Sequence, residues 1–114
     1  MSAKKKQVRA AFRTACFIRD GNKCRFCKAE PPKGTSVEDF LDAHHITDRN
    51  ELPNGGYVAE NGISLCAACH EKAEVYHESE KTIHEPGFLP NDLYNLIGSS
   101  FEKAVEASNK LGET

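Results

Sequence analysis

The sequence predicts a small α+β fold in which a β-hairpin leads into a helix, with further helices at both ends of the chain. Two short apolar segments, 41–46 and 62–65, have the length and composition of strands. The segment between them, 50–57, is dense in turn-forming residues. Two Cys-x-x-Cys pairs, one before and one after this hairpin, indicate a metal site that ties it to its neighbours.

The chain of 114 residues is long enough for one domain with a modest core. No apolar run approaches the roughly 18 residues that a membrane helix requires. The lysine-rich start is not followed by the apolar segment of a signal peptide. We therefore expect an intracellular, cytoplasmic protein with no membrane contact. Residues 1–114 are expected to form a single domain, with a core at about 12–80 and a helical extension at 86–114 packed on it.

Charge is distributed unevenly, although the net charge is only −2. Residues 1–36 contain ten Lys and Arg residues against two acidic ones, whereas residues 37–114 contain five against fifteen. A basic front half is suited to contact with phosphate groups, while an acidic rear half stays in solvent. The same pattern is equally typical of solvated surfaces, so charge alone leaves nucleic-acid binding open.

An amphipathic helix is predicted at residues 5–20 from the spacing of its apolar residues. The turn-forming Asp20-Gly21-Asn22 ends it. Cys16 lies one position off the predicted apolar stripe. This fifth cysteine is expected to be a small buried apolar side chain rather than a nucleophile. The stripe itself follows the helical spacing and comprises Val8, Ala11, Phe12, Ala15 and Ile18 or Arg19.

The cysteine pairs Cys24/Cys27 and Cys66/Cys69 predict a structural zinc knuckle. Two residues between the cysteines of a pair let both sulfurs point inward from one tight turn. Four thiolates leave no open coordination position, so the ion is expected to support the fold rather than the chemistry. Disulfides and a redox motif are the alternatives. A reducing cytosol disfavours the first, and the absence of a βαβ pattern disfavours the second.

The remaining helices are short. Ser36 predicts a capped single turn before the first strand. A helix is predicted to follow the second strand at about 67–80. Pro90-Asn91-Asp92 is predicted to open a short helix at 93–97, and a last helix begins with a capping box formed by Ser99 and Glu102.

Three histidines and an asparagine are the candidate functional residues. His44 and His45 end the first strand, Asn61 precedes the second, and His70 begins the following helix. Histidine is a metal ligand and, with an unperturbed pKa near 6.5, a base that is mostly neutral at pH 7. Neighbours on a regular strand point to opposite faces. His44 and His45 can therefore serve one site only if the strand is irregular or the substrate straddles its end.

Nearby polar residues can support these histidines. Asp42 shares a strand face with His44 and is either an extra ligand or a partner of one. Glu74 lies one helical turn after His70, where it can hold that imidazole or pair with a basic side chain. His77 is two turns away and is more readily a packed or exposed histidine than a ligand.

Segments 19–27, 42–46 and 61–70 together resemble the HNH endonucleases, in particular the branch with two Cys-x-x-Cys zinc pairs. The order of a His pair, an Asn and Cys-x-x-Cys-His is specific, whereas a single Cys-x-x-Cys is not. The likeness covers about residues 12–78. The resemblance implies a ββα-metal fold, also called a His-Me finger, and hydrolysis of phosphodiester bonds with a divalent cation.

The resemblance also implies a role for each candidate residue. His45 matches the general base, and His44 and His70 match ligands of the catalytic cation. Asn61 matches the residue that orients the base or its loop. Many members have Asp-His where this chain has His-His. The identity of the catalytic cation is therefore left open among Mg²⁺, Mn²⁺, Ni²⁺ and Zn²⁺, and the softer ions are favoured.

We therefore expect a metal-dependent endonuclease or nickase that acts on the phosphate backbone of DNA, encoded by a bacterium or a phage. Arg49, Arg25 and Lys28 are equal candidates to steady that backbone. The alternatives are a non-catalytic zinc-stabilised module that binds nucleic acid, or an accessory nuclease subunit of a phage packaging or restriction complex. A pure binding module requires no base such as His45.

Overall fold

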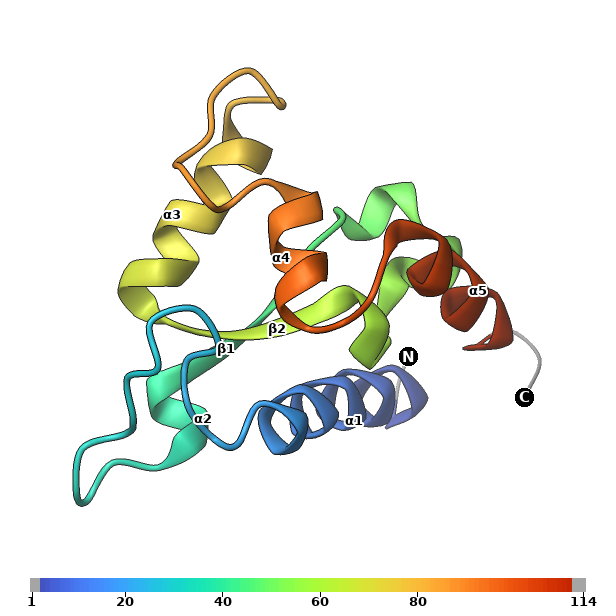
Figure 1. The fold of residues 1–114 in the computed structure, drawn as a ribbon. Helices are drawn as coiled ribbons and strands as arrows, with labels where there is room; N and C mark the ends of the chain where they lie inside the picture. Colours follow the sequence, from blue (N-terminus) through green and yellow to red (C-terminus); the bar gives the residue numbers. More distant parts are fainter. Residues whose placement is uncertain (1–2, 112–114) are drawn as a thin grey trace.

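The computed structural model of this protein describes residues 3–111 and confirms the α+β fold. A two-stranded antiparallel sheet lies at the centre and helices flank it (Figure 1). The helices are α1 (Ala3–Arg19), α2 (Val37–Phe40), α3 (Ala67–Glu78), α4 (Pro90–Leu96) and α5 (Phe101–Leu111). The strands are β1 (Leu41–His45) and β2 (Gly62–Cys66), joined through the 3-10 helices η1 (Arg49–Glu51), η2 (Pro53–Gly56) and η3 (Ala59–Asn61).

The sheet lies between two layers of helices. Figure 1 shows α1 on one side of the strands and α3 with α4 on the other. The register pairs Leu41 with Cys66 and His45 with Gly62. All five residues of β2 are buried, which explains why this segment reads as an apolar run rather than as an alternating strand.

The predicted stripe of α1 is wrong in part. The buried face of this helix is formed by Phe12, Cys16 and Phe17, while Ala11 and Ala15 are exposed. Ile18 is 69% exposed. Burying two aromatic rings removes far more apolar surface from water than burying alanines, so the helix turns its Phe side to the sheet. Cys16 is buried as predicted, but it lies at the centre of the stripe.

Asp20 fixes the end of α1 against β2. Its carboxylate is buried, pairs with Arg19 at 2.7 Å and accepts a hydrogen bond from the backbone amide of Ser64 at 2.9 Å. The Arg19 guanidinium also donates to the carbonyl oxygens of Ala59 and Gly62, both at 2.7 Å. The residue predicted as a turn former therefore also anchors the helix to the hairpin.

The short turn predicted at Ser36 is confirmed, since its hydroxyl accepts from the Asp39 amide at 3.1 Å. The predicted cap of the last helix is wrong. The Lys103 amide donates to the Ser100 hydroxyl at 3.1 Å, so Ser100 caps α5. Ser99 instead donates to the carbonyl oxygen of Glu60 at 2.8 Å and ties the C-terminal segment to the loop before β2.

The predicted opening of α4 at Pro90-Asn91-Asp92 is confirmed, and these residues already belong to the helix because proline fits its first turn. Phe88, Leu93, Tyr94 and Ala104 belong to the same hydrophobic core as the strands. Within residues 3–111, no helix combines the length and apolarity needed to cross a membrane.

Candidate functional site

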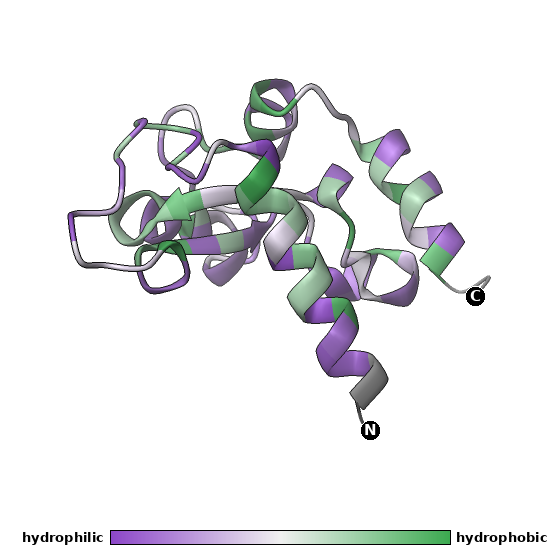
Figure 2. Ribbon diagram, turned by 90° about the horizontal axis from the view of Figure 1, so that it is seen from below, coloured by the Kyte–Doolittle hydropathy of each residue, from purple (hydrophilic) through white to green (hydrophobic). Residues whose placement is uncertain are grey.

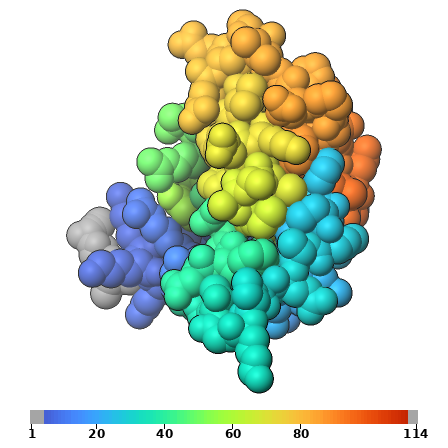
Figure 3. Space-filling model, turned by 90° about the vertical axis from the view of Figure 1, so that its left-hand side faces the viewer, coloured from blue at the N-terminus to red at the C-terminus, as the bar shows by residue number. Residues whose placement is uncertain are grey.

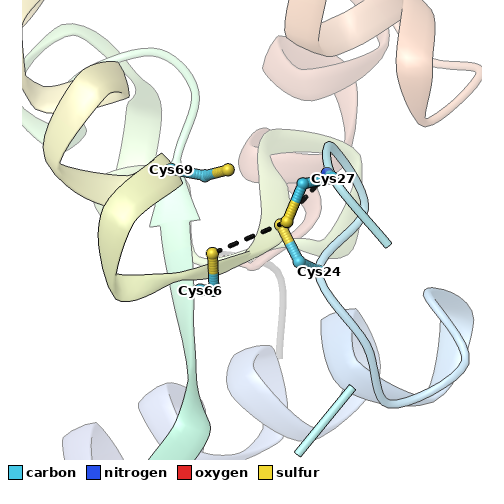
Figure 4. Close-up of side chains that lie close together, drawn as sticks. All are labelled: Cys24, Cys27, Cys66 and Cys69. Atoms are coloured by element: carbon cyan, nitrogen blue, oxygen red, sulfur yellow. Dashed lines mark hydrogen bonds between the residues drawn. The ribbon is translucent and has the colours of Figure 1, made fainter. Parts of the chain in front are cut away.

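The four cysteines of the predicted knuckle converge. Cys24 and Cys27 come from the loop after α1, Cys66 from the end of β2 and Cys69 from the first turn of α3 (Figure 4). All four sulfurs lie within 4.8 Å of one another, and those of Cys27 and Cys66 are 3.8 Å apart. Tetrahedral zinc with Zn–S bonds of about 2.3 Å places sulfurs about 3.8 Å apart. The cluster therefore fits a structural zinc ion.

The local electrostatics of the cluster favour a cation. Burial by itself raises the pKa of Cys24, but backbone amides, first that of Cys27, donate to its sulfur and lower the pKa to about 7. Burial, together with the neighbouring cysteines, raises the pKa of Cys69. A divalent cation offsets this cost because it attracts all four thiolates at once. Each of the five cysteines is free of disulfides, as the metal interpretation requires.

A second group of ligand atoms lies where β1 meets α3. One carboxylate oxygen of Glu74, Oε1, is 3.1 Å from Nδ1 of His44 and 3.2 Å from Nε2 of His70. Metal bonds of about 2.0–2.2 Å place neighbouring ligand atoms roughly 3.0–3.5 Å apart. The three atoms are therefore spaced as ligands of one ion. From the sequence alone, Glu74 is expected only in a supporting role, although its position one helical turn after His70 could have indicated a third ligand.

Asp42 supports this group from β1. Its Oδ2 atom lies 3.1 Å from Nδ1 of His70, which leaves Nε2 of that ring directed at Glu74. A carboxylate in this position fixes the tautomer and orientation of a metal-binding histidine. Of the two roles that the sequence left open for Asp42, the geometry favours that of a partner to a ligand.

The charges in the group suit a cation. The hydrogen bonds from His44 and His70 hold the pKa of Glu74 well below its ordinary value, so its carboxylate is ionised at neutral pH. Burial lowers the pKa of His44, which keeps a neutral imidazole available as a ligand. The hydrogen bond to Glu74 raises the pKa of His70, since the carboxylate stabilises its protonated form. A bound cation would take the place of that proton.

His45 lies on the opposite side of β1 from His44. Its ring stacks on Phe12 with centroids 4.6 Å apart and meets the Tyr57 ring edge-on, also at 4.6 Å. Burial, followed by the charges of His44 and Arg49, lowers the pKa of His45 to about 4. Its Nε2 atom is buried without a hydrogen-bond partner, so Nδ1 is the ring nitrogen that reaches solvent. The ring is therefore a neutral base at pH 7.

One cavity is lined by side chains from both faces of β1. A hollow of about 280 Å³ at the end of β1 is lined by His44 and His45 together with Ala43, Asp48, Arg49, His70, Glu74 and His77. The histidines thus reach the same space from opposite strand faces without any irregularity in β1. A substrate at the end of the strand can contact both.

Asn61 makes its side-chain hydrogen bonds to residues other than His45. Its side chain is fully buried, and Oδ1 accepts from the Thr47 amide at 2.9 Å and the Tyr94 hydroxyl at 2.8 Å. Its Nδ2 donates to the carbonyl oxygens of Thr47 and Gly56, at 3.1 and 3.2 Å. Gly56 has a positive φ of 65°, and a Cβ there would lie 2.9 Å from Nδ2 of Asn61. The family resemblance implies that Asn61 orients either the base or its loop. These hydrogen bonds match the second role, because they hold the loop.

The remaining candidate residues differ in whether they line this cavity. Arg49 lines the cavity beside His45. Arg25 is occupied elsewhere, because its guanidinium donates to the carbonyl oxygen of Leu96 at 2.8 and 3.0 Å. Lys28 is exposed in the zinc knuckle and is not among the residues that line the cavity. His77 lines the cavity, with its ring centroid 5.4 Å from that of His44, but it is outside the three-atom ligand group.

Comparison with known proteins gives one match. Residues 24–75 match the family model described as HNH endonuclease, which confirms the resemblance over this segment. The matched segment contains the four cysteines of the knuckle as well as both histidine groups. Neither the curated proteins nor the solved structures include a match to the chain.

Proposed function

Because residues 24–75 match the HNH endonuclease family, we propose that this protein is a metal-dependent nuclease that hydrolyses phosphodiester bonds of DNA. The observation that carries the proposal is the cavity at the end of β1. It combines three ligand-spaced atoms, of His44, His70 and Glu74, with the neutral ring of His45. We further propose that the whole chain acts as one domain, with the helices after residue 86 supporting the nuclease core.

In this proposal His44, His70 and Glu74 hold a divalent cation. Two imidazole nitrogens and one carboxylate oxygen form a mixed donor set that favours first-row transition metals over Mg²⁺. When bound, such a cation neutralises charge on the phosphate and on the leaving oxygen. Asp42 keeps the His70 ring in the tautomer that leaves Nε2 free for the ion.

His45 acts as the general base. Its Nε2 atom is buried, which leaves Nδ1 as the nitrogen that faces the cavity, and the low pKa keeps the ring neutral at neutral pH. We assign the one ring proton to Nε2, so that Nδ1 is free to accept a proton. A water molecule between Nδ1 and the phosphate can give up its proton to this nitrogen as it attacks. Phe12 and Tyr57 hold the ring plane from two sides, which limits the orientations of the base.

Arg49 and Asn61 act around this pair. Arg49 is exposed at the rim of the cavity, where its guanidinium can hold a non-bridging phosphate oxygen. Asn61 acts indirectly through the loop that begins at Thr47, which carries Arg49. The zinc knuckle fixes the start of α3 and with it the position of His70.

A plasmid-nicking assay tests the proposal. Wild-type protein is incubated with supercoiled plasmid and Mg²⁺, Mn²⁺, Ni²⁺ or Zn²⁺, and compared with His45→Ala and with the control His84→Ala, which changes an exposed loop histidine. We expect His45→Ala to lower the nicking rate about 10²–10⁴-fold and His84→Ala to leave it unchanged. If the wild type retains DNA but nicks with none of the cations, the non-catalytic binding module is the correct interpretation.

A further inference from the structure

A second, larger cleft opens beside the candidate active site. Its volume is about 640 Å³, within the roughly 300–1,000 Å³ range of ligand pockets. It lies between the N-terminal part of α1, the segment 49–57 and the end of α5. Figure 3 shows the first two of these, in blue and green, next to each other at one edge of the molecule.

The cleft is basic. Among the described residues that line it, Lys5, Arg9 and Arg49 are charged and the others are uncharged. Lys5 and Arg9 are exposed and lie one turn apart on α1, whose N-terminal part is mostly hydrophilic (Figure 2). No acidic residue within 3–111 lines the cleft, although the chain has a net charge of −2. Such a surface attracts an anion of extended shape.

The cleft adjoins the candidate active site at Arg49, which lines both spaces. Tyr57 lines the cleft and contacts two residues that line the active-site cavity. Its hydroxyl accepts a hydrogen bond from Nη1 of Arg49 at 2.9 Å, and its ring contacts the His45 ring edge-on. A linear anion that occupies the cavity can therefore continue over Arg49 into the cleft.

The chemistry of the cleft suits phosphates rather than bases. The one aromatic side chain that lines it is Tyr57, and the guanidinium of Arg9 already covers that ring at 5.5 Å from its centroid. Phe12 meets the same ring edge-on at 5.7 Å. The ring is therefore not free to stack on a base, and the lysine and arginine heads are the groups that remain for a ligand.

We propose that this cleft binds the DNA backbone on one side of the scissile phosphate. Lys5 and Arg9 contact phosphates there, and Arg49 stands at the junction with the active site. The inference rests on the proposed function and adds the path of the substrate to it. Contacts of this kind position the duplex without reading its sequence, so affinity should not depend on the sequence next to the cut.

Salt-dependent binding tests the cleft. Binding of a fluorescently labelled DNA duplex is measured by anisotropy over a range of salt concentrations, with the zinc-loaded protein and no added divalent cation. The double variant Lys5→Gln/Arg9→Gln is compared with Lys6→Gln/Arg13→Gln. The second pair removes the same charges from exposed positions of the same helix that do not line the cleft. Nicking with added cation is measured in parallel.

We expect the cleft variant to bind at least tenfold more weakly at low salt. Its slope of log affinity against log salt should be shallower by about 2, because two phosphate contacts are lost. The control variant should keep a slope close to that of the wild type. The nicking rate at subsaturating DNA should fall in the cleft variant alone.

The outcomes separate the inference from the function on which it rests. If the wild type nicks DNA and both double variants lose affinity equally, the cleft inference is wrong and the nuclease proposal stands. If the wild type binds without nicking and only the cleft variant loses affinity, the cleft stands and the nuclease proposal fails. Absence of any binding by the wild type overturns both.

Discussion

His44 and His45 are adjacent in β1, yet their rings lie in different layers of the molecule. The His44 ring faces α3 and bonds Glu74, whereas the His45 ring stacks on Phe12 of α1. Strand geometry dictates this separation, because successive side chains point to opposite faces. In the proposed function, metal binding and proton transfer therefore belong to two environments that meet at the end of the strand. Substitutions should separate the two properties.

Glu74→Gln should weaken binding of the exchangeable cation, while His45→Ala should leave that binding unchanged. The substitution removes the negative charge of the carboxylate whose Oε1 atom lies close to the nitrogens of both His44 and His70. The affinity should fall by at least the roughly 10–100-fold that loss of a supporting residue costs. Calorimetric titration with Mn²⁺ measures it, with Glu78→Gln on the exposed side of α3 as the control. Equal affinity in Glu74→Gln and wild type would remove Glu74 from the ligand set.

Asp42→Asn should lower the affinity for the same cation by about 10–100-fold without changing the fold. An amide can present its NH₂ group to Nδ1 of His70, which stabilises the wrong tautomer and directs the N–H of Nε2 at the ion. The matched control is Asp39→Asn, an exposed carboxylate in α2. If Asp42 were a direct ligand, the loss of cation affinity would exceed this range, and if it were only a solvated side chain, the affinity would not change. The titration therefore distinguishes both roles from that of a partner to His70.

The sequence predicts this site better than it predicts the packing around it. The two strands and the four cysteines lie where their patterns place them, because strand alternation and ligand spacing are local properties. The buried face of α1 is not local. Alanines fit the helical period as well as Phe12 and Phe17 do. The face that is buried is selected by packing against the sheet, which the local sequence of the helix does not contain. The partners of Asn61 are equally tertiary, since they come from the loop and from α4.

Asn61→Ala should destabilise the fold, not only slow the reaction. The substitution leaves the buried Thr47 amide and Tyr94 hydroxyl without the oxygen that accepts from both. One unsatisfied buried group costs roughly 1–3 kcal/mol, so a loss above ~2 kcal/mol is expected in urea unfolding. Asn95→Ala, on the exposed side of α4, is the control. A variant with wild-type stability and no activity would instead return Asn61 to a direct role in catalysis.

Zinc should copurify with the protein at about one ion per chain and survive dialysis, because four thiolates enclose it. Cys66→Ser should lose the ion, and with it the cooperative thermal transition, since this cysteine joins β2 to α3. Cys16→Ala removes a buried cysteine that is outside the cluster and should retain the zinc. Elemental analysis and circular dichroism of the three proteins measure both properties. Equal zinc content in Cys66→Ser and Cys16→Ala would contradict the four-cysteine site.

Cys16 should make the stability of the protein fall in alkaline solution. Burial raises the pKa of its thiol from the ordinary 9.0 to about 12. The folded state therefore keeps a proton that the unfolded state releases between these two values. The free energy of unfolding is unaffected by this group below about pH 9 and decreases as pH rises from about 9 towards 12.

Comparison of Cys16→Ala with wild type isolates this effect, because burial also raises the pKa of Tyr94 and adds an alkaline loss common to both proteins. The alanine variant should be less stable at pH 7, since it leaves space beside Gly62 and Phe12. Its unfolding free energy should then fall less steeply than that of the wild type above about pH 9, so the two curves converge. Urea unfolding at several pH values, with zinc present throughout, gives both curves. Parallel curves would mean that the thiol ionises as readily in the folded protein as in the unfolded chain, and that the gap between α1 and β2 admits water.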